Sequence, residues 1–180
     1  MGPLDLNALV GEVLALYGSA LEQGRLHSRL EPGLPLIEGD ATQLRQVTHN
    51  LLQNALDAVA ERADAQVEVR TELARSASNE VRAVRLVVTD NGPGFAEKVL
   101  KRAFEPYVTT KAKGTGLGLA VVRKIADEHG ARLRVGNLRE GGSSVGAVVG
   151  AEVSLSFSKL RPAATPDAGA GQGQGGNTTT

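Results

Sequence analysis

The sequence predicts an α/β two-layer sandwich, in which three helices pack on one face of a mixed, largely antiparallel sheet. Segments with helical apolar spacing alternate with segments of strand-like alternation. Strands expected over 66–73 and 82–89 are too close together for a crossover helix, so they should pair antiparallel. Hydrophobic residues make up 41% of the chain and aromatic residues only 3%, which favours a single aliphatic core.

The helical segments carry recognisable start and stop signals. Asp5 or Asn7 is a candidate N-cap for the first helix, which ends at Gly24, and Asp40 is a typical N-cap for the second. Gly130 stands where a C′ glycine would end the third helix. The three helices are predicted over 5–22, 40–62 and 117–129.

The strand segments are short and lie between turn-forming residues. Loops are predicted at PGLPL, 32–36, and over the Gly- and Lys-rich stretch 90–118. The five expected strands cover 25–31, 66–73, 82–89, 131–136 and 147–157.

Length and composition exclude several classes of protein. The chain has 180 residues, which suits one domain over 1–158 and a disordered Gly/Ala/Thr-rich tail over 159–180. Lys and Arg together number 20, as do Asp and Glu, which argues against a nucleic-acid binder. The absence of Cys excludes disulfides and thiolate metal sites. With no long apolar run and no basic leader, we expect a cytoplasmic domain that does not insert into a membrane.

Three polar residues share one face of the predicted helix 40–62. Asn50, Asn54 and Asp57 follow one another at i, i+4 and i+7. Asn is unfavourable inside a helix because its amide competes for backbone hydrogen bonds. One interpretation is a solvated polar face. The other is a row of oxygens facing a ligand, since an Asn oxygen is a hard, neutral donor suited to Mg²⁺.

A carboxylate follows an apolar strand in LVVTDNGPGF, 86–95. Asp90 stands at the strand end, and the turn after it contains Gly92 and Gly94. As a bare turn this is ordinary chemistry. An ionised Asp accepts hydrogen bonds only, so it could bind an exocyclic amine such as that of adenine. Glycines would let the backbone approach a flat base closely.

The segment KGTGLGLA, 113–120, opens a predicted helix with three glycines. Free amides at the positive end of a helix suit phosphate, although the spacing is neither a dinucleotide-binding fingerprint nor a P-loop. The preceding span contains Phe104 and Tyr107, and 96–124 holds seven basic residues against two acidic ones. A solvated basic loop is one interpretation. A lid over an anionic ligand is the other.

The order NLLQNALDA, DNGPGF, FEPY and GTGLGLA resembles the N, G1, F and G2 boxes of the histidine kinase catalytic and ATP-binding domain. That domain belongs to the Bergerat-fold (GHKL) superfamily, with DNA gyrase and MutL. The resemblance covers roughly residues 4–158. The stretch FEPYVTTKAKGTGLGLAVVRKIADEHG is most similar to sensor kinases of the nitrogen-regulation group.

The resemblance implies ATP and Mg²⁺ as the bound groups and assigns catalytic roles to three positions. Asn54 would hold Mg²⁺, Asn50 would support the metal or the phosphates, and Lys111 would reach the phosphates. Asp57 would line the phosphate side. Phe104 would help to anchor the lid.

The resemblance also assigns nucleotide contacts. Asp90 would bind the adenine amine, with Gly92 and Gly94 packed against the base. The contacts expected from the lid and the glycine motif are Tyr107, Val108, Thr110, Lys111, Lys113, Gly114, Thr115, Gly116, Leu117, Gly118 and Leu119.

The implied function is transfer of the ATP γ-phosphate to a histidine on a dimerisation and histidine phosphotransfer domain that this chain lacks, with a response regulator as second partner. His27, His49 and His129 have no phosphoacceptor context, and we interpret them as structural or surface residues. Superfamily ATPases carry a Glu at the position of Asn50, so hydrolysis should be slow. An ATPase and an ATP-sensing module remain the alternatives. Ala151 departs from the Thr that the family often places there.

Overall fold

The computed structural model describes residues 1–102 and 115–162 of the chain. Its centre is a five-stranded sheet in the order β2-β4-β5-β7-β6. β2 and β4 run parallel, and the other neighbouring pairs are antiparallel, including the predicted pair β4–β5. The strands are β2 (Leu26–Leu30), β4 (Val67–Arg75), β5 (Val81–Asp90), β6 (Arg132–Arg139) and β7 (Val148–Phe157).

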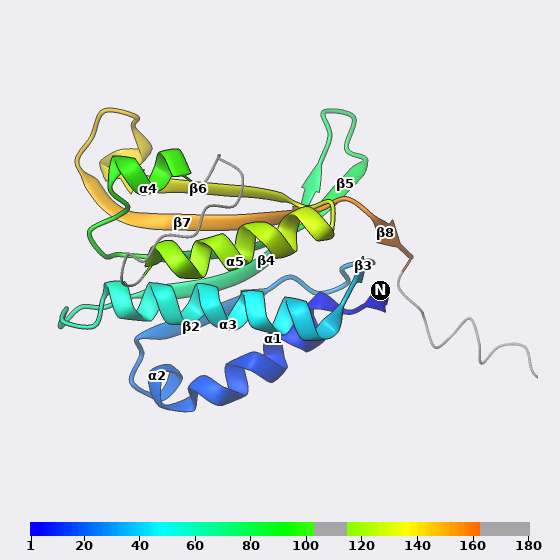
Figure 1. Cartoon of the computed structure of the whole chain (residues 1–180), viewed down its shortest axis with the longest axis horizontal. Helices are drawn as coiled ribbons and strands as arrows, with labels where there is room; N and C mark the ends of the chain where they lie inside the picture. Colours follow the sequence, from blue (N-terminus) through cyan, green and yellow to red (C-terminus); the bar gives the residue numbers. More distant parts are fainter. Residues whose placement is uncertain (103–114, 163–180) are drawn as a thin grey trace, which may run out of the picture.

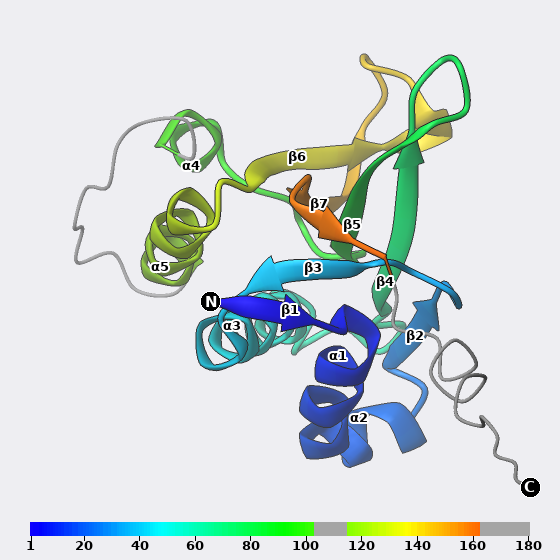
Figure 2. The ribbon, with the colours of Figure 1, turned by 90° about the vertical axis from the view of Figure 1, so that its right-hand side faces the viewer.

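The helices α1, α3 and α5 cover one face of this sheet (Figures 1 and 2), which confirms the predicted two-layer sandwich. A short helix, α4, lies within the stretch that we expected to be a loop. The first predicted helix is divided, because a 3₁₀ turn at Ala15–Tyr17 separates α1 from α2. The helices are α1 (Leu6–Leu14), α2 (Gly18–Glu22), α3 (Ala41–Ala58), α4 (Glu97–Arg102) and α5 (Thr115–Glu128).

The predicted caps are confirmed. Asp5 accepts a hydrogen bond from the Ala8 amide at 3.1 Å, and Asp40 accepts one from the Gln43 amide at 3.0 Å. Gly130 follows α5 with a φ of 61°, as expected for a C′ glycine. The second helix ends at Ala58, earlier than predicted, because the amides of Val59 and Ala60 bind carbonyls three residues back, each at 3.2 Å, instead of four. The Arg25 guanidinium also donates to the carbonyl of Val59 at 3.1 Å.

A second, three-stranded sheet in the order β1-β3-β8 lies at one end of the molecule, at the right of Figure 1. Its strands were not predicted, because they are short and contain or adjoin prolines: β1 (Gly2–Leu4), β3 (Leu36–Gly39) and β8 (Leu160–Arg161). The predicted disordered tail, 159–180, therefore begins too early. Leu160 and Arg161 pair with β3, and the Arg161 guanidinium lies 3.0 Å from the Glu38 carboxylate. The rest of that tail, 163–180, lies outside the described residues.

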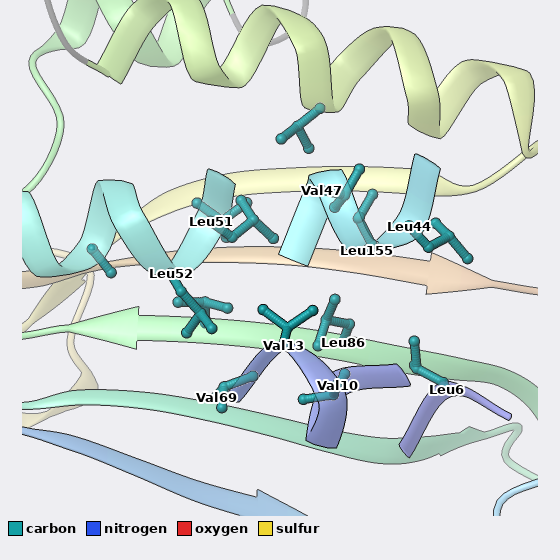
Figure 3. Packing of buried hydrophobic residues seen from close by; sticks show 14 of the residues in the cluster. Leu6, Val10, Val13, Leu44, Val47, Leu51, Leu52, Val69, Leu86 and Leu155 are labelled. Carbon is teal, nitrogen blue, oxygen red and sulfur yellow. The ribbon is translucent and has the colours of Figure 1, made fainter. Parts of the chain in front are cut away.

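The core lies between the helices and the inner face of the five-stranded sheet (Figure 3). Apolar residues at helical spacing on α3, and Val59 just after it, form a stripe that is buried over its whole length: Leu44, Val47, Leu51, Ala55 and Val59. It meets Leu86 of β5 and Leu155 of β7, both at most 1% exposed. None of the described helices is both long and apolar enough to cross a membrane.

Candidate functional site

A cavity of about 180 Å³ opens where α3 and β5 end and α5 begins. Most of its lining is apolar, as a flat aromatic ligand would require. Asn54 and Asp90 both line it, so the two residues predicted to hold opposite ends of one ligand share a single cavity. The described residues around it are Leu51, Asn54, Ala55, Ala58, Val88, Asp90, Pro93, Gly94, Phe95, Leu119, Ala151 and Val153.

Asp90 occupies a core position at the end of β5. The inward-facing row of this strand runs Val84, Leu86, Val88 and then Asp90, because side chains alternate along a strand. The Asp90 side chain is 9% exposed and accepts a hydrogen bond from the Gly92 amide at 2.8 Å. Burial raises the pKa of the Asp90 carboxyl, an effect that the amides of Gly92 and Ala151 partly offset.

The turn after Asp90 needs its glycines. A side chain at Gly92 would come within 2.9 Å of the carbonyl oxygen of Ala58, so the turn lies directly against the end of α3. Gly94 has a φ of 82°, a region that glycine reaches without strain. Both glycines were predicted to pack beside the base, and of the two Gly94 lines the cavity.

Asn91 and Asn137 anchor this turn on its two sides. The Asn91 side chain accepts from the Gln66 amide at 2.8 Å and donates to the carbonyl of Asp64 at 2.8 Å. Asn137, on β6, accepts from the Phe95 amide at 2.6 Å and donates to the Phe95 carbonyl at 3.0 Å. Sequence analysis missed Asn137, although Gly followed by Asn within a strand is an unusual pair that could have drawn attention to it.

The side-chain amide of Asn54 lies at the cavity on α3. Its Nδ2 is buried and has no hydrogen-bond partner among the described residues. The other such atom, Glu38 Oε2, is compensated by Arg161 at 3.0 Å. A buried polar group without a partner requires an explanation. A ligand that engages the Asn54 amide from the cavity is an explanation consistent with its position.

The other two members of the predicted polar row on α3, Asn50 and Asp57, do not line the cavity. Asn50 is half-buried one turn before Asn54. Asp57 is exposed, and its carboxylate accepts from the Gln53 amide at 2.9 Å. Neither belongs to the described lining. Their predicted roles on the phosphate side stay predictions.

The predicted lid residues Phe104, Tyr107, Val108, Thr110, Lys111, Lys113 and Gly114 lie outside the described residues. The glycine motif continues into α5, whose first residues are Thr115, Gly116, Leu117 and Gly118. An α-helix leaves its first four amides without intrahelical partners, and such amides are where helices bind anions, so the phosphate contacts predicted here stay predictions. Leu119, which follows, is 6% exposed and lines the cavity.

The three histidines occupy surface or structural positions, as predicted. His27 is exposed on β2, and the exposed His49 lies 2.6 Å from the Tyr17 hydroxyl. His129 is 3% exposed and has both ring nitrogens engaged, by the amide of Asp40 at 3.0 Å and the carbonyl of Ile125 at 2.9 Å. None of them belongs to the described cavity lining.

Two curated relatives show what kind of protein carries such a domain. The chain is 46% identical over 117 residues to the C4-dicarboxylate transport sensor protein DctB of Pseudomonas aeruginosa, covering 63% of this chain and 18% of that protein. It is 37% identical over 142 residues to the sensor histidine kinase ZraS of Escherichia coli O157:H7, covering 78% of this chain and 29% of that protein. The chain therefore spans less than a third of the length of these relatives.

Solved structures agree with the fold and with the sequence relatives. The catalytic domain of histidine kinase ThkA superposes with a TM-score of 0.66 at 29% identity, covering 87% of this chain and 94% of that one. ThkA in complex with the response regulator protein TrrA superposes with a TM-score of 0.64 at 27% identity, covering 88% and 41%. Residues 39–158 match the family described as histidine kinase-, DNA gyrase B-, and HSP90-like ATPase, and the chain belongs to that family.

Proposed function

We propose that this chain is the Mg-ATP-binding catalytic domain of a two-component sensor histidine kinase. It transfers the γ-phosphate of ATP to a histidine on a dimerisation domain outside this chain. The observation that carries the proposal is that Asp90 and Asn54 line one cavity, with an apolar wall between them. The names of the relatives support the kinase activity, and the family supports the use of ATP.

The base of ATP binds at the Asp90 end of the cavity. The carboxylate already accepts from the Gly92 amide, and its remaining lone pairs accept from the exocyclic amine of adenine. Val88, Val153 and Phe95 supply the apolar surface that a purine covers. A base with an oxygen in place of the amine would face the carboxylate with an acceptor, so ATP is preferred over GTP.

The phosphates lie toward Asn54 and the start of α5. The amide oxygen of Asn54 suits Mg²⁺, because one neutral oxygen completes a shell otherwise made of water and phosphate oxygens. The buried Nδ2 of the same amide, which has no partner among the described residues, donates to a phosphate oxygen. Bound Mg²⁺ would neutralise charge on the phosphates.

The remaining predicted residues complete the site in this proposal. Asn50 supports the metal or the phosphates, and Asp57 lies on the phosphate side. Lys111 and Lys113 reach the phosphates, and Tyr107 helps to anchor the lid. The amides from Gly114 to Leu119, together with Val108 and Thr110, surround the phosphate chain.

The transfer needs positioning and charge neutralisation more than proton transfer. A nitrogen of the accepting imidazole attacks the γ-phosphorus, the bond to the β–γ bridging oxygen breaks, and ADP leaves with the electron pair of that bond. The imidazole brings its own lone pair, so this domain supplies no general base. The amide of Asn50 could not act as one.

The partners in this proposal are the histidine-bearing dimerisation domain of the parent kinase and a cognate response regulator. The structure of ThkA bound to TrrA supports the second, because this chain resembles the kinase in that complex. We place the domain in the cytoplasm, where ATP is available. No nucleic acid takes part.

The experiment mixes this chain with γ-labelled ATP, Mg²⁺ and the separate dimerisation domain of its parent. We expect acid-labile phosphate on that domain and none when its acceptor histidine is replaced. Asp90→Ala serves as the matched inactive control. Free phosphate without labelled partner would instead identify an ATPase, and nucleotide binding with neither product would identify an ATP-sensing module. Either result would overturn the kinase assignment.

A further inference from the structure

We infer that Asn137 is a positioning residue for nucleotide binding, a role that rests on the proposed function. It holds the wall of the cavity formed by Pro93, Gly94 and Phe95 without lining the cavity itself. Asn137 belongs to β6, two strands away from Asp90 in the sheet.

Asn137 replaces a strand partner beyond the end of β5. Both polar atoms of its side chain bind the backbone of one residue, accepting from the Phe95 amide at 2.6 Å and donating to the Phe95 carbonyl at 3.0 Å. A neighbouring strand would satisfy the same two groups through its own backbone. The side chain therefore extends the sheet's hydrogen bonding to a segment that has left the sheet.

The register of the sheet aligns Asn137 with the site. Asn137 opposes Ala151 on β7, and Ala151 opposes Asp90 on β5. The chain leaves β5 after Asp90, and Phe95 then binds the side chain of Asn137. The turn between them therefore runs from one end of this row to the other, and it lines the cavity. One cross-strand row thus places both the carboxylate and the residue that holds the turn beside it.

Gly94 shows how closely the turn is fitted to Asn137. A side chain added at Gly94 would lie 2.8 Å from Asn137 Oδ1 and 2.5 Å from a methyl of Val148. The glycine is required by this contact as well as by its φ of 82°. Removing the Asn137 amide leaves the amide and carbonyl of Phe95 without partners and leaves a space beneath the turn.

Without Asn137 the wall must be ordered each time that nucleotide binds, and that ordering weakens binding. We expect Asn137→Ala to bind ATP about tenfold more weakly, as the loss of hydrogen bonds that order the wall would predict. We also expect the Phe95 amide to exchange with solvent deuterium faster, because its acceptor is gone.

Asn7 is the matched control. Its amide also joins two segments, donating to the Glu31 carbonyl at 2.7 Å and accepting from the Thr71 hydroxyl at 2.7 Å, away from the cavity. ATP is titrated calorimetrically into the wild type, Asn137→Ala and Asn7→Ala, well below their melting temperatures. Both variants should melt earlier, and only Asn137→Ala should lose affinity and Phe95 protection.

Each outcome has a defined meaning. Wild-type affinity in Asn137→Ala, or an equal loss in Asn7→Ala, would overturn the positioning role while leaving the proposed function intact. A wild type that does not bind ATP would overturn the proposed function instead. If Asn137→Ala does not fold, Asn137→Asp keeps the shape and the acceptor for Phe95 but loses the donor. Unweakened ATP binding by Asn137→Asp would also overturn the role.

Discussion

The same two helices, α3 and α5, are joined at one end of the molecule and separated by a cavity at the other. At the junction end, where α3 begins, His129 binds the Asp40 amide and Gln43 donates to Glu128 at 2.9 Å. At the cavity end, the buried Nδ2 of Asn54 has no hydrogen-bond partner among the described residues, and Asp90 is a buried carboxylate. Figure 1 shows the junction end beside β3 and the cavity end beside α4.

The two ends differ in whether their polar groups are bound within the protein. Polar groups at the junction end bind one another across elements that are distant in sequence. At the cavity, Asn54 Nδ2 has no partner among the described residues, and a buried polar group without a partner costs the free protein stability. Substitutions at the two ends should therefore separate stability from nucleotide affinity.

The largest effect is expected at Gly150, at the cavity end. A side chain there would collide with the backbone carbonyl of Asp90, which the sheet holds in place. We expect Gly150→Ala to lower the free energy of unfolding by about 3 kcal/mol or more, measured by urea denaturation. Gly39→Ala is the control, because its side chain would meet the movable end of Leu44 at 2.8 Å and should cost about 1 kcal/mol. Equal losses would contradict this contrast.

The next effect is expected at the junction end. His129→Ala removes a buried ring with two hydrogen bonds and an edge contact to Phe157, and we expect a loss of about 2 kcal/mol in the free energy of unfolding. ATP affinity, measured by calorimetry below the melting temperature, should stay unchanged. His27→Ala, at an exposed position, should change neither quantity. A loss of affinity in His129→Ala would show that the two ends are not separable.

A smaller change in stability is expected at Asn54. Its amide makes no hydrogen bond within the described structure, and Ala favours a helix over Asn, so Asn54→Ala should leave the free energy of unfolding within about 0.5 kcal/mol of the wild type or raise it. Asn7→Ala, which breaks two hydrogen bonds, should cost about 1 kcal/mol or more. Thermal melts compare the two variants. Destabilisation by Asn54→Ala as large as that of Asn7→Ala would mean that the Asn54 amide is structural.

The smallest effect is the pH dependence from Asp90. Burial raises the pKa of this carboxyl above its ordinary 3.8, so the folded protein holds the proton more tightly than the unfolded chain. The contribution of Asp90 is fully present below pH 3.8 and is lost as the pH rises through the raised pKa. The free energy of unfolding of the wild type, relative to Asp90→Asn, should therefore fall as the pH rises from about 4 toward neutrality. A flat or rising difference would contradict the burial argument.

The sequence predicts the parts of the fold that depend on local pattern. The apolar stripe of α3, the caps at Asp5 and Asp40, and the antiparallel pair β4–β5 all follow from spacing and residue type. The small sheet β1-β3-β8 does not, because its short strands gain their pairing only when distant segments meet.

The site divides in the same way. Asp90 and Asn54 are predictable because a carboxylate after an apolar strand and an Asn inside a helix both break a local rule. The role of Asn137 is harder to predict, because its partner Phe95 is distant in sequence and only the register of the sheet brings the two residues together. The apolar lining residues Leu51 and Ala55 look like ordinary core positions, because helical spacing does not distinguish a cavity wall from a filled core.

The most direct test is a calorimetric titration of Mg-ATP into the wild type, Asp90→Ala and Asn54→Ala under one set of conditions. If the nucleotide is held at both ends of the cavity, the wild type should bind it clearly and neither variant should bind it detectably. Circular dichroism should show that all three proteins are folded. Wild-type affinity in both folded variants would show that ATP does not occupy this cavity.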